Sequence, residues 1–105
     1  MFTVEGDCVV VNNCVSSSNY PVPHDNSESC VVTANEDVFL TWNSVFEIET
    51  CCDHLMVGEV DVDQIDEQTP TSLDEGEQIL WSSDFSVSFT GWQVCFSTDQ
   101  SKNNS

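Results

Sequence analysis

Apolar and polar residues alternate in four short stretches of this chain, residues 38–43, 46–49, 85–89 and 92–97. An alternation of period two is typical of β-strands that bury one face. Valine, threonine, phenylalanine and tryptophan, which strands favour, are plentiful, and no segment has a convincing amphipathic helical pattern. Clusters of serine, asparagine, aspartate and glycine separate the stretches. The pattern predicts an all-β fold, an antiparallel β-sandwich.

Three further segments have the composition of loops. Residues 16–26 contain two prolines, residues 61–77 are rich in acids, and residues 98–105 resemble a frayed tail. A chain of 105 residues suits one domain with a modest core.

The chain contains six cysteines, Cys8, Cys14, Cys30, Cys51, Cys52 and Cys95. A zinc site is disfavoured because the sequence has no C-x-x-C pair, and His24 and His54 lie far from any ligand pattern. Disulfide bonds are the favoured interpretation, since a small core needs covalent reinforcement. They indicate an oxidising compartment, the secretory pathway or the cell exterior.

Nineteen acidic residues face a single basic residue, Lys102, giving a formal net charge of −18. This charge disfavours nucleic acids and anionic membranes as partners, because both require basic patches. It favours cations and basic proteins. For most of the acids, solubility is a sufficient explanation.

No run of about eighteen apolar residues is present, so no transmembrane helix or membrane insertion is expected. Residues 1–5 lack the basic start and apolar stretch of a signal peptide. For a disulfide-bonded chain this suggests an extracellular module of a larger secreted or membrane-anchored protein.

Three motifs, in order, resemble those of the CUB domain family. The first is C-V-S-S-S-N-Y-P at residues 14–21, followed by Cys30. The second is F-E-I-E-T-C-C-D at residues 46–53, and the third is S-D-F-S-V-S-F-T-G-W at residues 83–92. The W-S-S-D…G-W-x-x-C version of the ending, residues 81–95, is similar to a short branch found in protist and algal surface proteins.

The resemblance covers residues 8–97 and leaves 1–7 and 98–105 as short tails. It implies a jelly-roll β-sandwich, an extracellular setting and a non-catalytic binding role, without fixing the ligand.

The resemblance also suggests disulfide partners. Cys30 pairs in the family with a cysteine near the amino end, here Cys8 or Cys14. Cys51 and Cys52 are adjacent, so they either form a vicinal disulfide or each pairs elsewhere. Cys95 lies on the opposite strand face from Trp92 and Val94, and is expected to link the outer sheet surface. The favoured set is Cys14–Cys30, Cys8–Cys95 and Cys51–Cys52.

Many CUB domains hold one calcium ion through three carboxylates. The matching positions are Glu49 of F-x-x-E, Asp53 after the central cysteines, and Asp84 of S-D-x-S. Calcium is a hard ion that takes oxygen ligands, and three converging carboxylates would repel one another without a cation. His24 stands where the family has a supporting tyrosine. The alternative is that all three acids are ordinary surface charges.

Three functions compete. The first is calcium-assisted recognition of a basic protein, since family calcium ligands often grip a partner's lysine. The second is glycan binding, with Trp81 or Tyr20 as the stacking platform. The third is a structural spacer. No catalytic triad, zinc motif or phosphate loop indicates an enzyme.

Overall fold

The structure is a computed structural model that describes residues 1–18, 20, 27–49, 51–83 and 90–98. The described residues form ten strands and no helix, so this part of the chain has no helix able to cross a membrane. The expected strand at 85–89, and residues 99–105 of the expected tail, lie outside the described residues.

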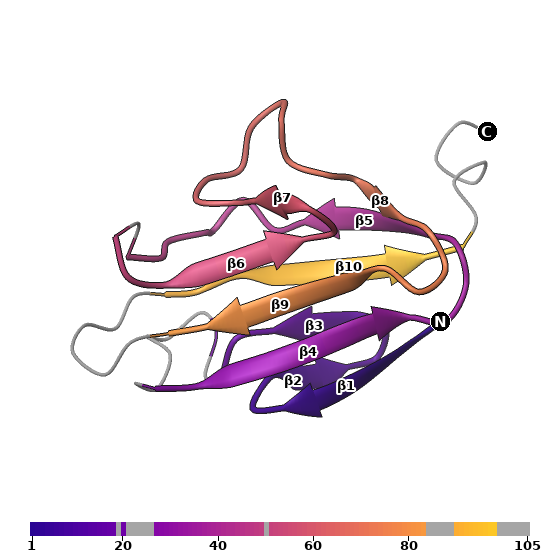
Figure 1. Cartoon of the computed structure of the whole chain (residues 1–105), viewed down its shortest axis with the longest axis horizontal. Helices are drawn as coiled ribbons and strands as arrows, with labels where there is room; N and C mark the ends of the chain where they lie inside the picture. The colour runs from indigo at the N-terminus through magenta and orange to yellow at the C-terminus, as the bar shows by residue number, and fades with distance from the viewer. Residues whose placement is uncertain (19, 21–26, 50, 84–89, 99–105) are drawn as a thin grey trace.

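The strands form two five-stranded antiparallel sheets that pack face to face (Figure 1). The first sheet consists, in spatial order, of β1 (Phe2–Gly6), β4 (Ser29–Ala34), β9 (Gln78–Ser82), β6 (His54–Val57) and β7 (Val60–Asp61). The second consists of β2 (Val9–Val11), β3 (Cys14–Ser16), β10 (Gln93–Ser97), β5 (Val38–Trp42) and β8 (Ser72–Leu73). The predicted antiparallel β-sandwich is confirmed.

Alternating residues of both sheets fill the space between them. In β10, Val94 and Phe96 are fully buried, whereas the residues on either side of them are partly exposed. Val38 and Leu40 of β5 are buried in the same way. The stretch at 46–49 differs from its prediction, because it forms only an isolated bridge between Glu47 and Gly91.

The first residues of the chain were expected to be a tail, and this expectation is wrong. Residues 2–6 form β1, which pairs along its whole length with β4. The side chain of Phe2 packs on Phe96 of the opposite sheet, with ring centroids 4.4 Å apart. Phe2 and Val4 alternate with polar neighbours, so β1 covers part of the core with its apolar face.

All six cysteines form disulfides, and one of the three predicted pairs, Cys51–Cys52, is confirmed. The other two predicted pairs are wrong, because Cys8 and Cys14 have each other's predicted partner. The bonds are Cys8–Cys30 and Cys14–Cys95. Cys14 and Cys95 lie directly opposite each other in the β3–β10 pair, on its outer face as expected for Cys95. Cys30 lies in the other sheet and is buried in the core, out of reach of an outward-facing Cys14.

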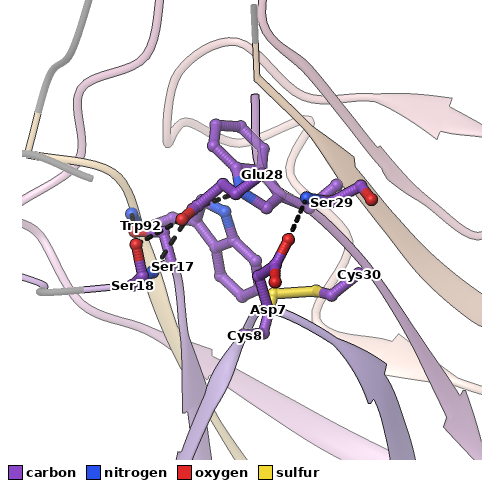
Figure 2. The surroundings of a disulfide bond; sticks show 9 residues. Asp7, Cys8, Ser17, Ser18, Glu28, Ser29, Cys30 and Trp92 are labelled. Carbon is purple, nitrogen blue, oxygen red and sulfur yellow. Dashed lines mark hydrogen bonds between the residues drawn. A yellow bond between two sulfur atoms is a disulfide. The ribbon is translucent and has the colours of Figure 1, made fainter. Parts of the chain in front are cut away.

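A sharp bend after β1 brings Cys8 to Cys30. Gly6 has φ +104°, and a Cβ at this position would lie 2.4 Å from the carbonyl oxygen of Ser29. The Asp7 amide donates to that same oxygen, and the Asp7 carboxylate accepts from the Ser29 amide at 3.0 Å (Figure 2). Glycine is therefore required where the chain passes from the first sheet to the second.

Candidate functional site

Two of the three predicted ligands, Glu49 and Asp53, lie at one end of the sandwich. Three strands of the first sheet reach this end, where Ser29, Ser82 and His54 stand side by side in register. Asp53 precedes β6, and the segment after β9 leads toward Asp84. The position of Asp84 itself lies outside the described residues.

Glu49 and Asp53 are brought together by a tight turn. The amides of Cys52 and Asp53 both donate to the Glu49 carbonyl oxygen, at 3.0 and 2.8 Å. In return, the Asp53 carboxylate accepts from the Glu49 amide at 2.9 Å. Asp53 is only 3% exposed and Glu49 is half-buried. The short E-T-C-C-D spacing therefore places two carboxylate-bearing residues in one turn.

The vicinal disulfide lies within this turn. A Glu49 carboxylate oxygen and the sulfur atoms of Cys51 and Cys52 lie within 4.8 Å of one another. Both sulfurs are held in the disulfide, so neither is available as a thiolate. This cluster is not a zinc centre, and its contribution to a metal site is limited to the carboxylate oxygens.

A second buried carboxylate, Glu28, was not anticipated from the sequence. Glu28 is 3% exposed and accepts hydrogen bonds from the Trp81 indole at 2.7 Å and from the amide and hydroxyl of Ser18 (Figure 2). Its backbone exchanges hydrogen bonds with Ser83, at 2.9 and 3.0 Å. No motif marks this residue, because its donors lie 10 and 53 positions away in the sequence.

No lysine or arginine occurs among the described residues. Carboxylate oxygens, which both Glu49 and Asp53 carry, are the ligands that a hard cation such as calcium prefers. Glu28 accepts hydrogen bonds on both of its oxygens, from Trp81 and Ser18, and joins distant parts of the chain. The candidate cation site therefore rests on Glu49 and Asp53, with Asp84 as the third residue expected from the sequence.

The tryptophans belong to the core. Trp81 and Trp92 are 2% and 0% exposed, with ring centroids 6.0 Å apart, and Trp42 packs on Trp92 at 6.4 Å. Burial of Trp81 removes it as a sugar-stacking platform. His54 is exposed on β6.

Tyr20, the other proposed platform, is partly buried at the same end of the sandwich. Its hydroxyl donates to the Val45 carbonyl oxygen, and burial raises the pKa of the Tyr20 hydroxyl. Hydrogen bonding of this kind fixes the side chain against the segment before Phe46. Tyr20 therefore helps to hold the chain that leads into the Glu49 turn.

Comparisons with protein-family models, with curated proteins and with solved structures found no match for this chain. The fold is a disulfide-bonded, two-sheet antiparallel β-sandwich, and the disulfides indicate an oxidising environment.

Proposed function

We propose that this chain is a non-catalytic, extracellular binding module of the CUB type, which recognises a basic protein with the help of one calcium ion. The observation that carries the proposal is the turn in which the backbone amide of Glu49 donates to the buried carboxylate of Asp53. Burying a charged carboxylate costs free energy, and a bound cation would offset part of that cost.

Glu49, Asp53 and Asp84 would hold the ion through carboxylate oxygens. Calcium would supply positive charge that reduces repulsion among these acids and fixes their positions. The hydrogen bonds from Cys52 and Asp53 to the Glu49 carbonyl already fix the backbone of the turn. Little further ordering of this segment would be needed when the ion binds.

The negative charge of the chain supports a basic protein as the partner. A net charge of −18 attracts basic proteins over a distance of about one Debye length, roughly 8 Å at physiological salt. A glycan partner is less well supported, because the indole ring of Trp81 is buried. The module would belong to a larger secreted or cell-surface protein.

The proposal is tested by thermal unfolding with and without millimolar calcium, in about 0.5 M sodium chloride so that general charge screening is nearly complete. At a hundredfold excess over the dissociation constant, calcium should add about 2.7 kcal/mol and raise Tm by roughly 10 °C. Asp84→Asn should lose this shift while keeping the response to sodium chloride. An equal calcium response in the parent and in Asp84→Asn contradicts the proposed site.

A further inference from the structure

A row of side chains crosses the outer face of the first sheet. In register from one edge to the other, the row is Glu5, Val31, Leu80, Met56 and Asp61. Paired residues of antiparallel strands share one face of the sheet. The row is therefore apolar over three central strands and ends in a carboxylate on each edge strand.

The apolar part of the row is accessible. Leu80 is 41% exposed, and Val31 and Met56 are half-buried. A shallow cavity of about 600 Å³ covers this part of the sheet, and its lining includes Glu5 together with these three residues. We call this cavity the sheet groove.

Polar rows border the apolar row on both sides. Toward the end of the sandwich that carries Glu49 and Asp53, the bordering row is Ser29, Ser82 and His54. Toward the other end it is Thr3, Thr33 and Gln78. The side-chain amide of Gln78 donates to the Thr33 hydroxyl at 3.1 Å. The apolar strip is consequently one side chain wide along the strands, which suits a narrow partner better than a broad protein surface.

The acids at the ends of the row determine the charge of that partner. Glu5 and Asp61 are exposed, and no lysine or arginine occurs among the described residues to pair with them. Neighbouring strands lie about 4.8 Å apart, so the two carboxylates are separated by about 19 Å across the sheet. An extended peptide advances about 3.4 Å per residue, so two basic residues about six positions apart span this distance.

We infer that the sheet groove binds an extended segment of a partner protein, in which an apolar centre is flanked by lysine or arginine. The apolar centre would cover Val31, Leu80 and Met56, and the basic residues would pair with Glu5 and Asp61. The inference rests on the proposed function only in treating the chain as a protein-binding module. The groove uses neither Glu49 nor Asp53, so this binding requires no calcium.

The probe is the heptapeptide acetyl-KTLTVTK-amide, which presents two lysines and two apolar residues on one side. We expect it to bind the parent in EDTA, as measured by NMR chemical-shift titration, with perturbed signals centred on β4, β6 and β9. Two control peptides, acetyl-ETLTVTE-amide and acetyl-KTSTSTK-amide, should each bind at least about tenfold more weakly. Equal binding of either control overturns the inference.

A matched pair of variants locates the surface. Leu80 and Val9 are 41% and 42% exposed, but Val9 lies on an edge strand of the other sheet. Leu80→Ser should weaken peptide binding at least about tenfold, whereas Val9→Ser should change it by less than about twofold. If Leu80→Ser unfolds, the double variant Glu5→Gln/Asp61→Asn at two exposed positions should still weaken binding and reduce its dependence on salt. Unchanged peptide binding in the double variant would contradict the pairing of Glu5 and Asp61 with the basic residues of the peptide.

The outcomes separate this inference from the calcium proposal. Peptide binding in EDTA that calcium leaves unchanged supports the groove, even when the calcium-dependent rise in Tm is absent. A calcium-dependent rise in Tm without peptide binding overturns the groove alone. Self-association of the parent that Leu80→Ser abolishes would assign the groove to a second copy of this chain, and would also overturn the inference.

Discussion

Glu28 and Asp53 are equally buried, at 3% exposure, yet their surroundings differ. Glu28 accepts hydrogen bonds from the core residue Trp81 and from Ser18, and so joins distant parts of the chain. Asp53 accepts from the Glu49 amide four residues away and closes a local turn. Burial alone therefore does not show what a carboxylate does, because Glu28 joins segments that are distant in the sequence whereas Asp53 lies in a local turn at the end of the sandwich.

The largest expected effect comes from removing the structural carboxylate. Glu28→Ala should lower the free energy of unfolding by about 3 kcal/mol, because the Trp81 indole and Ser18 lose a charged acceptor inside the protein. Urea denaturation measures this change. Glu28→Gln, which keeps one acceptor oxygen and the side-chain shape, should lose only about 1 kcal/mol. If Glu28→Ala is as stable as the parent, Glu28 is not a structural carboxylate and does not differ from Asp53 in this respect.

Asp53→Asn should have its main effect in the presence of calcium. Asparagine retains an oxygen that accepts from the Glu49 amide, so unfolding without calcium should change by less than about 1 kcal/mol. The stabilisation of about 2.7 kcal/mol expected for the parent at a hundredfold excess of calcium should disappear. Chemical denaturation with calcium and with EDTA measures both quantities. A variant that is strongly destabilised in EDTA would show that Asp53, like Glu28, is structural.

The smallest effect is expected from the vicinal disulfide. Cys51→Ser/Cys52→Ser should reduce stability by less than about 1 kcal/mol, because the bridge closes almost no loop. The Asp53 turn should persist, since its hydrogen bonds to Glu49 involve neither sulfur. Urea denaturation of this double variant measures the change in stability, and calcium titration shows whether the Asp53 turn still responds to the ion. A loss of calcium response would show that the bridge itself positions Asp53.

Much of the fold was predictable because it depends on local patterns. Alternation in 38–42 and 93–97 identified β5 and β10 and the outward position of Cys95. β1 was missed because its alternation is short and its place depends on pairing with β4, about 30 residues later in the chain. The disulfide partners were exchanged for the same reason, since strand pairing between β3 and β10 decides which cysteines meet.

The candidate site was predictable only in part. Glu49 and Asp53 are close in sequence, so a motif could place them in one turn, as the structure does. Glu28 carries no local signal, because its partners come from two other segments of the chain. Sequence patterns therefore identify acids that are grouped along the chain more readily than acids that folding brings to distant partners.

We propose that Asp53 contributes to a cation site and that Glu28 does not. Isothermal titration of calcium into the parent, Asp53→Asn and Glu28→Gln, in about 0.5 M sodium chloride, tests it most directly. We expect one ion per chain for the parent and Glu28→Gln with similar affinity, and at least about tenfold weaker binding for Asp53→Asn. Equal calcium binding by Asp53→Asn and the parent, or loss of binding in Glu28→Gln, would contradict the account.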